Sequence, residues 1–268
     1  MSSEYLIIKL GGSLVSGKTG VLNSKLVKAY VDEIKKCVVS DNSKDNPNSQ
    51  RLVLTVGGGG LSRTYRDVAL ECGEDSSDDQ HRIGIVTTWL NAELLRSLLS
   101  DFSYKRVLGV GVYAQGSKEG EDNIAKDFQS WLSGKEPVIV GGGFITGASS
   151  DYNSVLLASK IGVERFYKLT DVDHVYSVDP KTNPNAKKLI DISWGEYIEL
   201  IKGENGEISK SADEEEAHKP GQHVPIDLHA AELAEKNNIS CVILDGRSAS
   251  VIGDICGAKK LEGTVIHP

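Results

Sequence analysis

The stretch LIIKLGGS, residues 6–13, decides the fold of this 268-residue chain, because it is an unbroken apolar run that ends at a pair of glycines. Such a run is typical of a parallel strand buried on both faces. Glycine just beyond the strand lets backbone N–H groups approach an anion with no side chain in the way. The pattern recurs at LVLTVGGGG (52–60), VLGVG (107–111) and VIVGGG (138–143). We therefore expect a phosphate-rich ligand at the carboxyl edge of a parallel sheet.

Strand-like and helix-like segments alternate along most of the chain. Apolar residues at helical spacing predict helices over 24–38, 61–72, 83–99, 123–132, 150–161 and 227–237. Strands are predicted at 52–56, 106–112, 137–140, 165–169 and 240–244. This alternation indicates an α/β fold with a mainly parallel sheet covered on both faces. The polar stretches 40–50 and 202–220 are expected to be surface connections, and the role of the second stays open.

The composition is that of an ordinary globular protein. Hydrophobic residues make up 39% and charged residues 25%, so a packed core is expected rather than disorder. The net charge of −8 disfavours binding to nucleic acid or to an anionic membrane. The chain has no membrane-span run and no signal-peptide pattern at its start, and its four scattered cysteines are typical of reduced thiols. We expect a cytoplasmic location.

Lys9 and Arg63 are candidate ligands for phosphate. Lys9 comes two residues before the first glycine pair, so its ammonium could neutralise a phosphate that the backbone amides hold. Arg63 is predicted on the first turn of the helix after the second glycine loop, where it could bind the same kind of group. Either residue could instead be structural or merely solubilising. The pattern is not a Walker A loop, because no G-x-x-x-x-G-K-[S/T] occurs.

Ser149, Ser150 and Asp151 open a predicted helix after the glycines at 141–143. Serine and aspartate are preferred helix N-caps, so capping alone would explain them. In a functional interpretation the hydroxyls bind a phosphoryl group while Asp151 orients Lys9, and the two interpretations are compatible. Asp171 and Asp173 follow the predicted strand at 165–169. Their carboxylates could contact a ribose, contact water on Mg²⁺, or cap a turn.

Three other chemistries lack the residues that they need. GVGVYA (109–114) matches a loose dinucleotide pattern, but Gly116 and Gly120 interrupt the helix that should follow, and no acidic residue ends the next strand. The six histidines show no metal-ligand spacing, so no metal site is predicted. A G-x-S-x-G elbow for a hydrolase is absent.

Taken together, these motifs resemble the amino acid kinase superfamily and, within it, the archaeal-type uridylate (UMP) kinases. KLGGS (9–13) resembles the family's phosphate loop, and VGGGGLSRTYRDVA (56–69) is similar to its acceptor loop and following helix. IGIVTTWLNAELL (83–95) matches its I-G-x-x-x-T-x-x-N-A helix, and TGASSD (146–151) stands where the family has T/P-G-H-T-T-D. TDVDHVYSVDPKTNPNAKKL (170–189) resembles its nucleotide-binding stretch, the most specific motif, and IDLHAAELAEKNNISCVILDG (226–246) its C-terminal helix and strand.

The resemblance implies a three-layer α/β/α sandwich, with an acceptor-binding lobe at 1–145 and an ATP-binding lobe at 146–268. It implies that Lys9 and Asp151 are catalytic, with Asp151 organising the lysine. The residues implied to bind ATP are Lys9, Gly11, Gly12, Ser13, Thr170, Asp171, Asp173, Tyr176 and Asp179. Those implied to bind the acceptor are Gly57, Gly58, Gly59, Arg63, His81, Thr146, Ser149 and Ser150. Mg²⁺ would be held mainly through phosphates and water, and the chain would form a homo-oligomer, commonly a hexamer.

The implied reaction is transfer of a phosphoryl group from ATP to UMP, in the pyrimidine biosynthesis pathway. Phosphoryl transfer needs positioning and charge neutralisation, and a phosphate acceptor is already ionised at neutral pH. No general base is evident, which suits a phosphate or carboxylate acceptor better than an alcohol.

Four departures from the family pattern leave the acceptor open. His81 stands where relatives have aspartate, Trp89 where they often have arginine, and His174 where they have glycine; Ala148-Ser149-Ser150 replaces His-Thr-Thr. One alternative is a kinase of this fold for another small phosphate or carboxylate. Isopentenyl phosphate kinases normally have a histidine after the second glycine loop, and residues 61–65 contain none. Carboxylate kinases typically have a second catalytic lysine. Lys210 and Lys219 lie in the corresponding region, but no sequence motif supports either of them in that role. The other alternative is a non-catalytic nucleotide- or oxyanion-binding protein.

Overall fold

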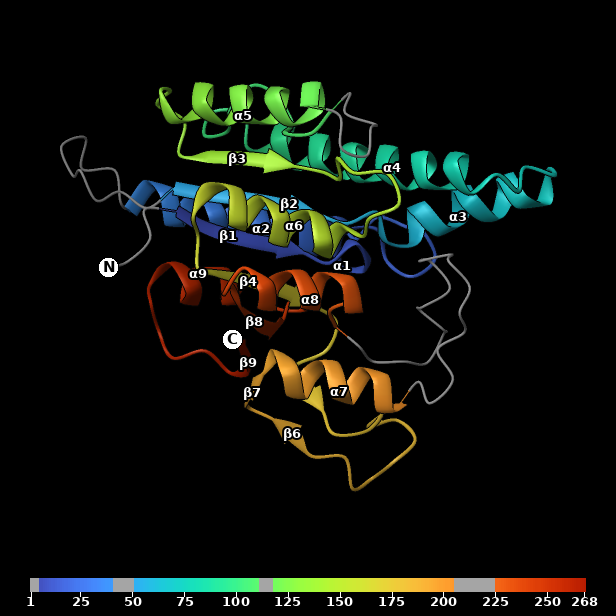
Figure 1. Ribbon diagram of the computed structural model, residues 1–268. Coiled ribbons are helices and arrows are strands. Elements are labelled where there is room, and N and C mark those ends of the chain that lie inside the picture. The colour runs from blue at the N-terminus through green and yellow to red at the C-terminus, as the bar shows by residue number, and fades with distance from the viewer. Residues whose placement is uncertain (1–4, 41–50, 111–117, 205–224) are drawn as a thin grey trace.

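A computed structural model describes residues 5–40, 51–110, 118–204 and 225–268 (Figure 1). The central sheet of this part has the order β3-β2-β1-β4-β8-β9-β7. These strands are β1 (Tyr5–Leu10), β2 (Arg51–Val56), β3 (Val138–Gly141), β4 (Arg165–Thr170), β7 (Asp191–Ser193), β8 (Ser240–Asp245) and β9 (Gly263–His267). Neighbouring strands are parallel except for β8 and β9. The predicted mainly parallel α/β sheet is therefore confirmed.

Helices cover both faces of the sheet and complete the three predicted layers (Figure 1). On one face lie α5 (Lys118–Leu132), α6 (Ser150–Ile161), α7 (Trp194–Glu204) and α8 (Leu228–Lys236). On the other lie α2 (Ser24–Ser40), α4 (Ser77–Leu98) and α9 (Ser250–Cys256). The side chains of β1 alternate between the two cores, with Ile7 in the first and Ile8 in the second. Two further helices, the short α1 (Gly12–Ser16) and α3 (Gly59–Glu71), begin just beyond the carboxyl ends of β1 and β2.

The predicted lobes 1–145 and 146–268 share one sheet, because β1 pairs directly with β4. Ile7 lies opposite Phe166 in this pairing, and both side chains are fully buried. A small separate hairpin of β5 (Val175–Tyr176) and β6 (Lys188–Leu189) lies beside the sheet. None of the helices in the described part of the chain is both long and apolar enough to span a membrane.

The prediction of a strand at 106–112 is wrong over residues 106–110, the part of this range that the structure describes. Residues 106–110 touch β3 only through an isolated bridge from Leu108 to Gly141. Arg106 is exposed, and Gly109 adopts φ +91°, which turns the chain away from an extended path. Residues 111 and 112 lie outside the described part. Helices α1, α7 and α9 and strands β5, β6, β7 and β9 were also not predicted from the sequence.

Substitution of Ile34 by alanine tests the packing of α2 against the sheet. Ile34 is fully buried in the core between the sheet, α2 and α9. We expect Ile34→Ala to lower the free energy of unfolding by about 2–5 kcal/mol, because it removes a packed side chain and leaves a cavity. Val39 lies on the same helix with its side chain 55% exposed, so Val39→Ala should change stability by less than about 0.5 kcal/mol. Urea denaturation measures both, and equal losses would contradict this packing.

Candidate active site

A row of polar side chains crosses the sheet one or two residues before the carboxyl ends of its central strands. Lys9 on β1 lies opposite Thr55 on β2 and opposite Lys168 on β4. Paired residues of neighbouring strands point to the same face of a sheet. The residues two positions earlier in these strands, such as Ile7, belong to the core beneath α6 and α8. The row therefore faces those helices, and all three of its side chains are buried.

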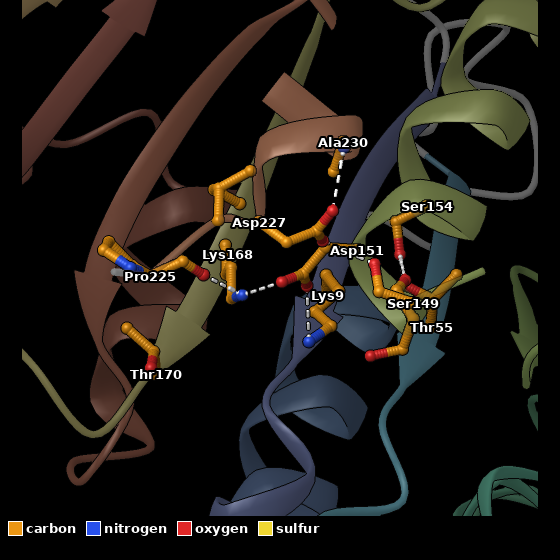
Figure 2. Close-up of polar contacts among 12 residues, drawn as sticks. Lys9, Thr55, Ser149, Asp151, Ser154, Lys168, Thr170, Pro225, Asp227 and Ala230 are labelled. Carbon is orange, nitrogen blue, oxygen red and sulfur yellow. Dashed lines mark hydrogen bonds and ion pairs between the residues drawn. The ribbon is translucent and has the colours of Figure 1, made fainter. Parts of the chain in front are cut away.

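The start of α6 supplies the partners of this row (Figure 2). Asp151 points down from the first turn, where its Oδ1 lies 2.7 Å from Lys9 Nζ. Its Oδ2 accepts a hydrogen bond from Lys168 Nζ, which also donates to the carbonyl of Pro225. Nearby, the hydroxyls of Thr55 and Ser154 are hydrogen-bonded at 2.8 Å. The predicted contact between Asp151 and Lys9 is therefore present.

Burial and charge together set the protonation of this cluster. Burial lowers the pKa of Lys9 to about 8, although the Asp151 carboxylate works in the opposite direction. The charge of Lys168 lowers the Lys9 pKa further. Burial would raise the pKa of Asp151, but the charges of Lys168 and Lys9 hold it well below its usual range. Two buried ammonium groups thus share one contacting carboxylate, an arrangement that a further anion would stabilise.

The two predicted glycine loops pack directly against each other beside this cluster. A Cβ on Gly12 would lie 2.2 Å from the nitrogen of Gly59, and a Cβ on Gly59 would lie 2.2 Å from the oxygen of Gly12. Gly59 also has φ +64°, which favours glycine. The Asn91 side chain on α4 fixes the second loop, donating to the carbonyls of Gly57 (2.8 Å) and Gly58 (3.2 Å). Only glycine allows this contact between loops.

Backbone donors are available at α1 rather than at every predicted glycine. The N–H of Gly11 donates to Leu169 O at 2.8 Å, and that of Gly57 donates to Leu10 O at 3.1 Å. The N–H groups of these two glycines are therefore used in hydrogen bonds at the ends of the strands, and the missing side chains leave space for the loops. Gly12 and Ser13 lie in the first turn of α1, where N–H groups have no acceptor within the helix. A bound oxyanion can use those groups.

The predicted acceptor residues outside the second loop lie on α3, on α4, at the start of α6 and in the turn before α6. Ser150 is near it, because its Oγ lies 3.1 Å from where a Cβ on Gly57 would be. Ser149 caps α6, accepting the N–H of Tyr152 and donating to Asp227, so the capping interpretation of this serine is confirmed. Thr146 is half-buried between β3 and α6, and His81 is half-buried on α4.

Arg63 is exposed, and it lies in the second turn of α3 rather than the first. The helix begins at Gly59, earlier than the predicted start at residue 61.

The predicted nucleotide residues separate into two groups. Ser13 and Asp171 line a hollow of about 540 Å³, together with Lys18 and Arg247. Thr170, at the end of β4, is buried beside it.

Asp173, Tyr176 and Asp179 are instead held by nearby parts of the chain. The Asp173 carboxylate accepts hydrogen bonds from Tyr176 OH (2.9 Å) and Lys188 Nζ (2.7 Å). The Asp179 carboxylate accepts the N–H of Lys181 at 2.8 Å, which closes a turn. Contact of these groups with a nucleotide stays a prediction.

Lys168 is the buried residue that the sequence analysis did not single out. Its signal was a lysine inside a predicted parallel strand, RFYKL at 165–169, where both faces should be apolar. Trp89, noted as a departure, has a structural role, because its buried indole donates to Gly143 O at 2.7 Å.

A magnesium ion finds no dedicated protein cage in the described part of the chain. No group of three or more histidine, cysteine, aspartate or glutamate side chains lies close enough there to hold a metal. Both oxygens of Asp151 face lysines. These residues fit a metal that enters with a polyphosphate and is held by its oxygens and by water.

A buried lysine beside two interlocked glycine loops defines an α/β phosphate-binding protein. The family model described as the amino acid kinase family matches residues 4–245, and the chain belongs to that family.

Similar proteins span the full length of the chain. It is 28% identical over 266 residues to the uridylate kinase of Staphylothermus marinus, covering 99% of this chain and 100% of the relative. Identity to the uridylate kinase of Methanoculleus marisnigri is 30% over 246 residues, covering 91% and 87%. The crystal structure of uridylate kinase from Archaeoglobus fulgidus is similar at a TM-score of 0.70 and 27% identity, covering 97% of this chain and 99% of that one.

The contact between the glycine loops can be tested by adding a single methyl group. We expect Gly12→Ala to lower the free energy of unfolding by about 1–3 kcal/mol, because its Cβ would overlap the backbone of Gly59. Gly195→Ala is the matched control, since a Cβ there meets nothing nearer than 3.8 Å. Urea denaturation compares the two variants. A Gly12→Ala protein as stable as the control would contradict the close approach.

Proposed function

We propose that this protein transfers the γ-phosphoryl group of ATP to UMP, giving UDP and ADP. The observation that carries the proposal is the Lys9 ammonium, which is buried and paired with Asp151 near the end of the strand that leads into the first glycine loop. One loop would then hold the transferring group and the other the acceptor phosphate. The family assignment and the names of the full-length relatives support this choice of reaction and of acceptor.

The charge state of Asp151 supports a phosphate acceptor over an alcohol. An alcohol needs a general base to take its proton. Asp151 is a poor base, because the two lysines hold its pKa well below its usual range in spite of its burial. A phosphomonoester is already ionised near neutral pH and needs no base. An acceptor phosphate oxygen then attacks the γ-phosphorus of ATP, and the bond from that phosphorus to the β-bridging oxygen breaks as ADP leaves.

Each part of the site has a role in the proposed transfer. Lys9 and the N–H groups of Gly12 and Ser13 neutralise the transferring phosphoryl group. The acceptor phosphate and nucleoside are assigned to Gly57, Gly58, Gly59, Arg63, His81, Thr146, Ser149 and Ser150, with residues 1–145 forming most of the acceptor lobe. The ATP nucleoside is assigned to Thr170, Asp171, Asp173, Tyr176 and Asp179 in the lobe at 146–268. Mg²⁺ enters with ATP, bound by phosphates and water.

The proposed setting is a cytoplasmic homo-oligomer, such as a hexamer, in pyrimidine biosynthesis. Exposed apolar side chains on α3 and α4, including Tyr65, Val68, Val86 and Leu90, support the oligomer. Apolar groups gathered on a surface are typical of an interface between proteins.

The acceptor is tested by measuring ADP release from ATP and Mg²⁺ with UMP, CMP, dUMP, isopentenyl phosphate, acetylglutamate or carbamate. We expect selective turnover of UMP. Lys9→Met should lower kcat by about 100-fold or more, because a preorganised charge on the transferring group is lost. Faster turnover of another acceptor would replace UMP in the proposal. Nucleotide binding without any turnover would favour a binding protein.

The reaction should slow at alkaline pH. The Lys9 pKa is lowered from 10.5 to about 8, chiefly by burial, so the ammonium is present below pH 8 and is lost above it. We expect kcat/KM to fall as the pH rises through about 8. Lys9→Arg provides the control, because a guanidinium keeps its charge and should remove this decline even at lower activity. A wild-type profile that stays flat to pH 10 would contradict the assignment.

A further inference from the structure

Lys168 occupies the position beside Lys9 on the neighbouring strand, and its side chain is 7% exposed. Its ammonium makes contacts with two segments that are far apart in the sequence. One is Asp151 Oδ2 on α6, and the other is the carbonyl of Pro225, just before α8 (Figure 2). Both contacts therefore hold the Lys168 ammonium in place. The described residues bury this side chain almost completely.

Asp151 divides its two oxygens between the two lysines. Oδ1 faces Lys9 and Oδ2 faces Lys168. Lys168 has a second acceptor in Pro225, whereas the ion pair of Lys9 is with Asp151 alone among the described residues. An incoming phosphoryl oxygen can therefore compete for the Lys9 ammonium, while Lys168 keeps the carboxylate in place and ionised.

We propose that Lys168 is a positioning residue for phosphoryl transfer, which holds Asp151 by one oxygen so that Lys9 can pass from the other oxygen to the transferring group. This inference rests on the proposed function for its catalytic consequence. Without Lys168, both oxygens of Asp151 become available to Lys9, and the ammonium is held more tightly on the carboxylate than on the phosphoryl group.

The charges around Lys9 predict a second effect of removing Lys168. Asp151 from α6 and Asp227 from α8 both raise the Lys9 pKa, and Lys168 from β4 lowers it. Cys241 on β8 stays a neutral thiol, because burial raises its pKa far above the ordinary value. Tyr197 on α7 likewise stays neutral, since burial raises its pKa. Loss of the Lys168 charge therefore raises the pKa of Lys9.

The test compares Lys168→Met with Lys135→Met, which removes a charge from an exposed site. We expect Lys168→Met to lower kcat about tenfold or more, because the ammonium of Lys9 is misplaced. The KM values for ATP and UMP should change by less than roughly threefold. The alkaline decline in kcat/KM should move to higher pH. Lys135→Met should behave as wild type in every measurement.

A folded Lys168→Met protein with wild-type kcat and an unmoved pH profile would overturn the inference, as would a change confined to KM. Circular dichroism and urea denaturation show whether the Lys168→Met protein is folded. If it is not, the same kinetic and pH measurements on Lys168→Gln test the inference, because the amide still donates hydrogen bonds but carries no charge. The Lys9 pKa is also measured directly by NMR of its side-chain ammonium, with Lys9→Arg assigning the signal. Comparing the Lys9 pKa of wild type and variant in this way needs no acceptor. Absence of UMP turnover in the wild type would therefore overturn the proposed function but not the effect of Lys168 on Lys9.

Discussion

One carboxylate shared by two buried lysines is the interaction on which the site depends. Removing an ammonium group from water costs several kcal/mol, and a partner at short range must offset that cost. Asp151 provides this partner for both Lys9 and Lys168. The arrangement leaves the cluster attractive to a further anion, beside backbone N–H groups that also favour one. The stability of the buried cluster and its affinity for phosphate therefore have the same physical origin.

The parallel sheet makes this cluster possible, because its register aligns residues from distant parts of the sequence. Lys9 and Lys168 are neighbours only because β1 and β4 pair in the register that places them opposite each other. The turn before α6 then directs the first residues of that helix over the row. The packed glycines set the distance between the two loops. The Asn91 side chain on α4 fixes the second loop by a hydrogen bond to its backbone. Each constraint acts on the backbone, so the side chains of the cluster are positioned before any ligand arrives.

Much of this arrangement could be predicted from sequence, and the exceptions have physical causes. The helix Ser150–Ile161 was predicted to the residue, because a serine cap, an apolar face and a terminal glycine all agree. The contact of Asp151 with Lys9 was predicted from the functional interpretation of this helix start and from the family resemblance, and it is present. Lys168 was not predicted, because only the pairing of β4 with β1 shows that a lysine within a strand is buried beside another. The strand at 106–112 was wrong because apolar runs also occur where a chain touches a sheet edge at single points.

The departures from the family pattern do not count equally against UMP as the acceptor. The indole of Trp89 is buried and bonded to Gly143, so this substitution is part of the packing between α4 and the loop after β3. His174 is buried edge-to-face against Tyr176, with Nδ1 3.3 Å from Asp173 Oδ2, in the stretch predicted to bind the nucleotide. His81, like Ser149 and Ser150, is a departure that the resemblance assigns to the acceptor, and it is half-buried on α4. An imidazole can donate to the same ribose hydroxyls that an aspartate would accept from. We therefore expect discrimination between acceptors to depend on His81 more than on Trp89 or His174.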